Sequence, residues 1–201
     1  MLACPAERRF ARPCLEALED RCSPATLTLN VTYGLGRNVT LSGDLTDTSH
    51  PAGQLITIQG MVNGQVVTDA QGHYSLNATP QYLGTVGARK SDGSSNVATN
   101  AITDAAPVLN VLKATEGIDH VWTISGTLTY NRPFDSLTVN FGGVPAHIVG
   151  QTTTATSDGA FTLSVRLDGT TQDNGTIWAE ALSPWNLVSN RLYATIRQTG
   201  T

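Results

Sequence analysis

The chain carries one pattern twice, and this repeat limits the folds that are open to it. Four short segments recur in the same order, offset by 83 to 94 residues: Val39–Thr46 and Trp122–Thr129, Thr68–Leu76 and Ala155–Leu163, Gly84–Ala88 and Gly175–Ala179, and Ser95-Asn96 and Ser189-Asn190. The shared positions hold alternating apolar residues and turn residues, with no catalytic group among them. The repeat therefore predicts two copies of one domain, and it describes their scaffold rather than their chemistry.

Length and composition agree with two small domains built from strands. The 201 residues suffice for two units of about 90. Hydrophobic residues make up 40% of the chain, enough for two cores, whereas charged residues make up only 14%, against about 25% in a typical domain. Thr, Ser, Asn and Gly fill the polar positions instead. Because threonine fits a pleated sheet and glycine and asparagine form its turns, this composition favours an all-β fold.

Charge and hydropathy exclude two classes of partner. The net charge is −4 and there is no basic strip, whereas nucleic-acid binding rests on clustered Lys and Arg. No apolar run reaches the length of about 18 residues that a membrane-spanning helix needs. We therefore expect no nucleic acid as a partner and no transmembrane segment.

Residues 1–25 differ in character from everything after them. This leader contains a basic run and then Cys14–Cys22, a short amphipathic helix former with Leu15 and Leu18 on one face. It also holds all three cysteines, at positions 4, 14 and 22, so both repeats fold without disulfides. Structural zinc needs four ligands, and three thiols without an adjacent histidine make a poor site. The leader is predicted to be mostly disordered or helical, without a metal.

Each repeat contains about seven predicted strands. In the first, Thr26–Tyr33 alternates apolar and polar residues, and Asn63-Gly64 between apolar residues is a strong hairpin signal. The strands expected in the second are Val108–Ala114, Val121–Thr129, Ser136–Phe141, His147–Thr153, Ala160–Leu167, Ile177–Leu182 and Arg191–Ile196. A short linker, Asp104–Pro107, joins the units. This spacing predicts two antiparallel β-sandwiches, at residues 26–105 and 106–201, arranged as an elongated pair.

The turn-and-strand motif of each repeat resembles a known family. Asp69–Leu76 and its partner Ser157–Leu163 are similar to the D-x-x-G-x-[YF]-x-[LV] element of bacterial Ig-like modules, and the S-G-x-L-T element adds to the likeness. A similar signature occurs in transthyretin-like domains attached to carboxypeptidases. The resemblance covers about 175 residues as pattern rather than identity, and it implies tandem Ig-like sandwiches of the transthyretin or fibronectin kind. Sandwiches host many functions, so it implies no activity.

The leader has a resemblance of its own. Leu15–Arg21 reads Leu-Glu-Ala-Leu-Glu-Asp-Arg and resembles the LEALEDR-type N-terminal segment found on large secreted and cell-surface proteins of some environmental bacteria. In that family the segment precedes extracellular β modules and is regarded as an export or sorting feature. The resemblance implies a secreted or cell-surface bacterial protein. The alternative is a disordered terminus with a marginal helix.

No arrangement of residues predicts catalysis. The four histidines, His50, His73, His120 and His147, show no ligand spacing and do not recur between the repeats. There is no G-x-S-x-G motif and no predicted helix to carry a nucleophile. The acids are scattered through turns rather than paired for glycoside hydrolysis. We therefore expect a protein that is not an enzyme, with no catalytic residues.

No cofactor or metal is predicted, and calcium is the one alternative that the acids raise. Asp104 in the linker, Glu116 and Asp119 in the first loop of the second unit, and Asp69 or Asp158 could supply oxygen ligands. Nothing shows the dense D-x-D-x-D spacing of a strong site. Turn capping explains most of these acids better.

Aromatic residues supply the only candidate contact site. Trp122 and Trp178 fall within strands and are predicted to be core, whereas Trp185 lies in a loop next to a proline, and the matching loop of the first repeat, residues 91–94, has no tryptophan. Tyr130 and Phe134 flank another turn, which could line the same end of the sandwich as Trp185 or the opposite end. Exposed loop aromatics are frequent ligand contacts. The alternative for Trp185 is that it folds back over the end of a sandwich.

Two functional hypotheses follow. The first is a non-enzymatic extracellular structural or adhesion module, a spacer or stalk whose partner is a cell-surface protein or a polysaccharide. The second is a carbohydrate- or ligand-binding module that uses Trp185, Tyr130 and Phe134.

Overall fold

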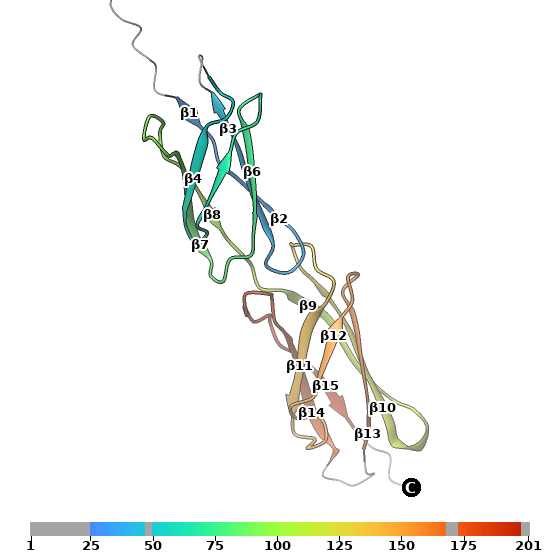
Figure 1. Cartoon of the computed structure of the whole chain (residues 1–201). Coiled ribbons are helices and arrows are strands. Elements are labelled where there is room, and N and C mark those ends of the chain that lie inside the picture. The colour runs from blue at the N-terminus through green and yellow to red at the C-terminus, as the bar shows by residue number, and fades with distance from the viewer. Residues whose placement is uncertain (1–24, 47–49, 168–172, 198–201) are drawn as a thin grey trace, which may run out of the picture.

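The structure, a computed structural model, describes residues 25–46, 50–167 and 173–197. Within these ranges the chain is almost entirely strand, apart from turns and one short 3-10 segment at Ile118–His120. Figure 1 shows two β-sandwiches placed end to end, with β8 leading directly into β9 at the joint between them. The predicted leader helix and the three cysteines lie outside the described residues.

The first sandwich consists of two antiparallel sheets. In one, the central strand β3 (Val39–Thr46) pairs on one side with β1 (Thr26–Leu27) and β2 (Asn30–Tyr33), and on the other side with β6 (His73–Ala78). The facing sheet has the order β5-β4-β7-β8, formed by β4 (Leu55–Gly60), β5 (Gly64–Val67), β7 (Gly84–Lys90) and β8 (Ala98–Ile102).

The second sandwich repeats this arrangement. One sheet has the order β13-β10-β9, formed by β9 (Val108–Glu116), β10 (Val121–Thr129) and β13 (Ala160–Arg166). The other has the order β12-β11-β14-β15, formed by β11 (Leu137–Gly143), β12 (Thr152–Ala155), β14 (Gly175–Ala181) and β15 (Leu192–Ile196). The strand order is the same in both units. The prediction of two tandem antiparallel sandwiches is confirmed.

Each sandwich has its own hydrophobic core, as the alternating pattern requires. In β3 the inward positions are buried and the outward ones are not, and Leu41 has no exposed surface. The equivalent residue of β10, Ile124, is buried to the same degree. The first core draws on residues between 25 and 102, and the second on residues between 109 and 196. The alternation in the sequence thus places one side of each strand in the core between two packed sheets.

The two most specific repeat motifs meet across the sheet. Gly43 of the S-G element is the cross-strand partner of Tyr74, and Gly126 is the partner of Phe161. A Cβ on Gly43 would overlap the carbonyl oxygen of Thr28. One on Gly126 would overlap the Phe161 ring. The glycine therefore leaves room for the aromatic ring and the neighbouring strand, which explains why both motifs recur together.

Tyr74 also explains why a segment predicted as one strand forms two strands. Thr26–Tyr33 was expected to be continuous, but β1 and β2 are separated at Thr28 and Leu29. The Tyr74 hydroxyl donates to the carbonyl of Thr28, and the amide of Asp44 donates instead to the Thr28 hydroxyl at 2.9 Å. Hydrogen bonds to these side chains thereby replace one backbone–backbone hydrogen bond between the strands. Phe161 has no hydroxyl, and β9 stays a single strand, although its register with β10 shifts between Thr127 and Leu128.

Two other expectations were wrong in detail. His147–Thr153 is not a strand: residues 146–150 form a turn, in which the Ile148 amide donates to the Pro145 carbonyl at 3.0 Å, and β12 starts at Thr152. Asn63-Gly64 does not form a two-residue hairpin turn. Gly64 already pairs with Ile58 inside the β4–β5 ladder, so the chain reverses before it. The apolar stretches suggested the right hairpin but not its turning point.

The Ser-Asn landmark is a clamp on the first strand of each unit. The side-chain amide of Asn96 donates to the Leu27 carbonyl at 3.1 Å, and its oxygen accepts from the Leu27 amide at 2.6 Å. Asn190 makes the same pair of bonds with Leu109, at 3.0 and 2.8 Å. One asparagine thus mimics a backbone strand partner, 69 residues away in one unit and 81 in the other.

We expect Asn96→Ala and Asn190→Ala each to lower the free energy of unfolding by about 2 kcal/mol, because each leaves a backbone donor and acceptor without this partner. Chemical denaturation of the full chain measures the loss. Asn110→Ala is the matched control, since its amide makes only one long contact, 3.4 Å from the Thr129 hydroxyl. Equal losses for Asn190 and Asn110 would contradict the clamp.

Candidate functional site at the joint

The loops at the facing ends of the two sandwiches form a contact region around the linker. Only residues 103–107 separate β8 from β9. The second sandwich contributes its β10–β11 loop, which carries Tyr130 to Phe134, and its β14–β15 loop, which carries Trp185. All three candidate contact residues from the sequence therefore lie at this end of the second sandwich. We call this region the joint.

Arg132 connects the second sandwich to the first. Its guanidinium carbon lies 3.4 Å from the centre of the Tyr33 ring, and one of its Nη atoms donates to the Thr103 carbonyl at 2.9 Å. The Tyr33 hydroxyl in turn accepts from the Thr103 amide at 2.9 Å. A guanidinium stacked on an aromatic ring contributes on the order of 1 kcal/mol. One arginine thus holds the end of β2 and the linker together.

Tyr130 fixes the linker from the other side. Its hydroxyl donates to the carboxylate of Asp104 at 2.6 Å. Burial raises the pKa of Tyr130, and the hydrogen bond to the Asp104 carboxylate raises it further. Phe134 meets the Tyr130 ring edge-on with a centroid distance of 5.9 Å, and both rings pack against the second core. The linker is therefore anchored to the second sandwich by a charge-assisted bond.

Trp185 belongs to the second sandwich but packs against the core of the first. Its loop is a tight turn, in which the Ser183 amide donates to the Leu187 carbonyl at 2.9 Å and Asn186 has a φ of 62°. From the first sandwich, the Arg37 Nε donates to the Pro184 carbonyl at 2.7 Å. The indole is half-buried. Trp185 thus folds over the end of a sandwich, and that sandwich is the neighbouring one.

The structure gives all three aromatic candidates intramolecular partners, and their role as ligand contacts stays a prediction. The sequence did not indicate the parts played by Tyr33, Arg37 and Arg132. The Arg37 bond spans 147 residues and the Arg132 bond spans 29. Nothing in a short window of sequence reports such pairs, because they depend on how two loop ends meet.

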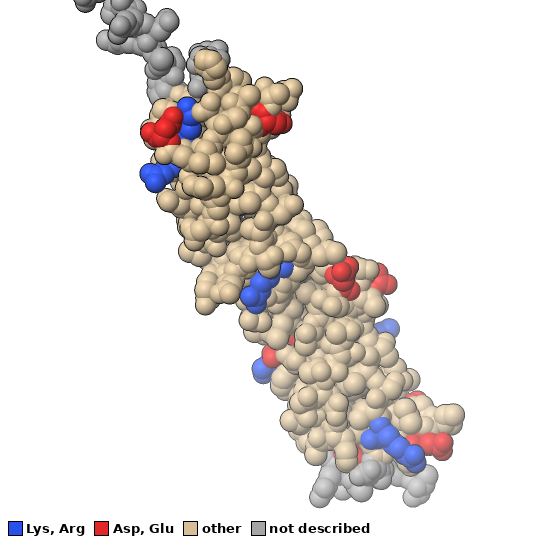
Figure 2. All heavy atoms as spheres, viewed as in Figure 1, with Lys and Arg blue, Asp and Glu red and all other residues tan. Residues whose placement is uncertain are grey.

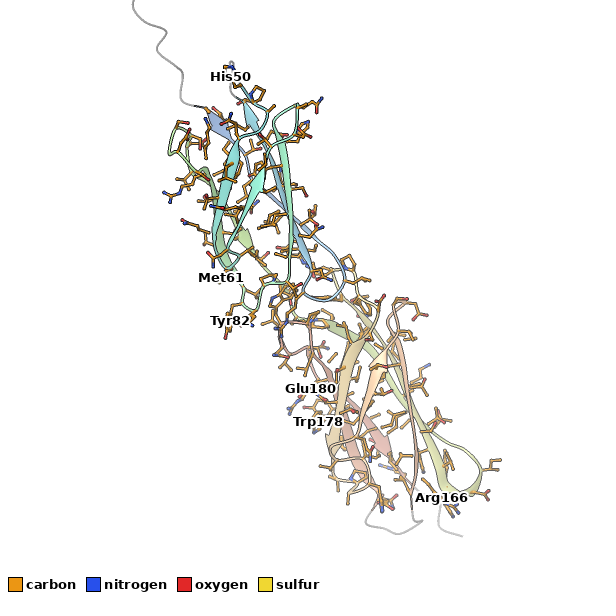
Figure 3. The ribbon with its side chains drawn as sticks, in the orientation of Figure 1. His50, Met61, Tyr82, Arg166, Trp178 and Glu180 are labelled. Atoms are coloured by element: carbon orange, nitrogen blue, oxygen red, sulfur yellow. The ribbon has the colours of Figure 1, made fainter. Side chains whose placement is uncertain are left out.

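Of the other two tryptophans, both predicted to be core, one lies in the core and one does not. Trp122 is core, with 5% of its surface exposed. The prediction for Trp178 was wrong: it lies on the outer face of its sheet, flat against Gly142, with the Arg191 guanidinium 4.1 Å from its ring centre. Arg191 also pairs with Glu180 at 2.7 Å. Figure 3 shows Trp178 and Glu180 on the same side of the second sandwich.

Metal-ligating groups do not gather at the joint. Among the described residues, no three His, Cys, Asp or Glu side chains form a group that could hold a metal ion. Asp104 lies at the joint, whereas Glu116 and Asp119 follow β9 at the other end of the second sandwich. Figure 2 shows Lys and Arg on this face as separate groups. In the part of the chain described, no helix is long and apolar enough to span a membrane.

No protein-family model matches the chain, and no curated protein matches it. Among solved structures, it is similar to a tetra-tandem repeat in the extending region of a large adhesion protein, with 23% identity over 87% of this chain and 50% of that one, and a TM-score of 0.39. The chain thus spans half of that structure.

Two further solved structures are similar at lower sequence identity. The fibronectin(III)-like modules of Clostridium thermocellum CbhA are 13% identical over 84% of this chain and 93% of theirs, with a TM-score of 0.34. A 1.5-MDa bacterial ice-binding adhesin is 13% identical over 89% of this chain and 65% of that one, with a TM-score of 0.35. Identity this low carries no information on function, which rests on the residues of the chain itself.

Proposed function

We propose that the chain is a non-enzymatic spacer of a bacterial secreted or cell-surface protein. The spacer would hold the parts of the assembly on either side of it apart and in line. The observation that carries the proposal is the joint. Three separate contacts cross it: Arg132 on Tyr33, Arg37 on the Pro184 carbonyl, and Trp185 on the first core. A five-residue linker alone restricts the angle between two domains without fixing it. These contacts add the restraint that an extended spacer needs.

The joint also favours the spacer over ligand binding through Trp185. The half-buried indole covers the first core, and its loop carbonyl is bonded to Arg37. A ligand that used the covered indole face would have to displace the neighbouring sandwich.

The resemblance of the leader supports an extracellular location. Residues 26–201 contain no cysteine, so the sandwiches need no oxidative folding.

Residual dipolar couplings of the isotopically labelled full chain test the spacer. We expect the two sandwiches to report one shared alignment tensor, because the joint makes them tumble as one body. Two unequal tensors would contradict the spacer proposal.

The location of the protein is tested on intact producing cells, where external protease should remove the protein while a cytoplasmic marker survives. Recovery of protected protein with the cytoplasmic marker would contradict the extracellular placement.

A further inference from the structure

A shallow depression of about 520 Å³ lies on the first sandwich, away from the contacts of the joint. It crosses the outer face of the sheet formed by β2, β3 and β6 and reaches the neighbouring edge strand β5. Its polar lining includes Ser42 and Asp44 from β3, His73 and Ser75 from β6, and Asp69 from the turn before β6. Val67 of β5, which is 56% exposed, forms an apolar side.

The strand register places these groups together. Asp44 is the cross-strand partner of His73, and Ser42 is the partner of Ser75, so both pairs face outward on adjacent rows. His73 Nδ1 is hydrogen-bonded to the Asp44 carboxylate. That hydrogen bond, with the negative charge of Asp44, raises the pKa of His73. Asp69 Oδ1 accepts from the amides of Gln71 and His73, each at 2.9 Å, and this fixes the turn.

The second sandwich shows that the fold does not require this chemistry. At the equivalent positions, Asp44 is replaced by Thr127, Asp69 by Thr156 and His73 by Ala160. The scaffold around them is retained, since Ser42-Gly43 corresponds to Ser125-Gly126. The Asp44–His73 pair is therefore present in one copy only, whereas an acid in the turn is kept in both, since Asp158 Oδ1 accepts from the Ala160 amide at 3.2 Å. The histidine did not stand out in the sequence because its partner Asp44 is 29 residues away.

The lining determines the class of ligand. Carboxylates accept hydrogen bonds from hydroxyl groups, serines both donate and accept, and Val67 offers an apolar surface to C–H groups. None of the described residues that line the depression is Lys or Arg, and the His73 imidazole is already hydrogen-bonded to the Asp44 carboxylate, so the lining does not favour an acidic ligand. A polyol of sugar size satisfies donors, acceptors and the apolar side together. We propose that this depression binds a neutral saccharide, a function separate from the spacer.

The test is a titration of the nitrogen-15-labelled full chain, followed by its amide signals. The probes are D-glucose, D-galactose, D-mannose, L-fucose and N-acetyl-D-glucosamine, with N-acetylneuraminic acid and trilysine as charged comparisons. We expect at least one neutral sugar to shift the amide signals of residues 42–44 and 69–75. The double variant Asp44→Thr/His73→Ala should weaken that affinity about tenfold or more, because it removes charged hydrogen-bonding partners.

The controls come from the repeat itself. The double variant installs the residues that the second sandwich already carries at these positions, so it should fold, and its undisturbed amide signals report this. Thr127→Ala/Thr162→Ala alters the equivalent face of the second sandwich and should leave the affinity unchanged. The proposal is overturned if no neutral sugar shifts these signals, if only trilysine does, or if the first double variant binds as tightly as the wild type.

Discussion

Replacing Arg132 and Trp185 by alanine together is expected to uncouple the two sandwiches while each stays folded. The change removes the guanidinium stacked on Tyr33 and the indole that covers the first core. Loss of the half-buried indole alone should destabilise the first sandwich by about 2 kcal/mol, which lowers its melting temperature by roughly 8 to 16 °C. The alignment tensors of the two sandwiches should then differ, and calorimetry should resolve a separate first transition.

The chain offers a matched control in its other arginine–tryptophan pair. Arg191 lies over Trp178 on the outer face of the second sandwich, away from the joint. Arg191→Ala/Trp178→Ala removes the same two residue types, yet it should preserve the shared tensor. If both double variants kept one tensor, the joint contacts would not be what aligns the sandwiches.

Gly126→Ala is expected to destabilise the second sandwich by about 3 kcal/mol or more, a large loss for the addition of one methyl group. The added Cβ would overlap the Val111 carbonyl oxygen and the ring of Phe161. The ring is 3% exposed and has no space to withdraw. Denaturant unfolding, followed by Trp122 and Trp178 fluorescence, measures the loss.

Gly150→Ala separates crowding from backbone strain in the same sandwich. Gly150 has a φ of 81°, but a Cβ there would meet nothing within 4 Å. Its cost should therefore be only that of a left-handed alanine, about 1 to 2 kcal/mol. An equal or larger loss for Gly150→Ala would show that the Gly126 contact is looser than the structure indicates.

The features that the sequence predicted are those encoded within a few residues. Alternation in β3 and β10 and the turn glycines before β6 and β13 depend on neighbours along the chain, so their duplication was visible. Trp178 shows that this local pattern can still be misinterpreted. Ile177, Ala179 and Ala181 are all fully buried, and strict alternation among them places Trp178 outward. That signal was present in the sequence, but the prediction placed Trp178 in the core because it falls within a strand.

The joint and the depression could not be predicted in the same way, because each depends on contacts between distant segments. Arg37 and Pro184 meet only when two complete sandwiches are placed end to end. Asp44 and His73 meet only in one register of β3 with β6. A single proline, arginine or histidine carries no periodic signal that would identify its partner. Sequence located the candidate aromatic loops but not what they contact.

The asparagine clamps have a mechanical consequence for a protein that is pulled at its ends. The first strand of each unit begins one residue before the clamped leucine, at Thr26 in the first unit and at Val108 in the second, and the chain leaves from the last strand at the opposite end (Figure 1). Tension therefore acts along the strands, across ladder bonds that lie perpendicular to them. Those bonds share the load in shear instead of parting one after another. In each unit the asparagine bonds to the second residue of the first strand, so its side chain is among the first to resist that load.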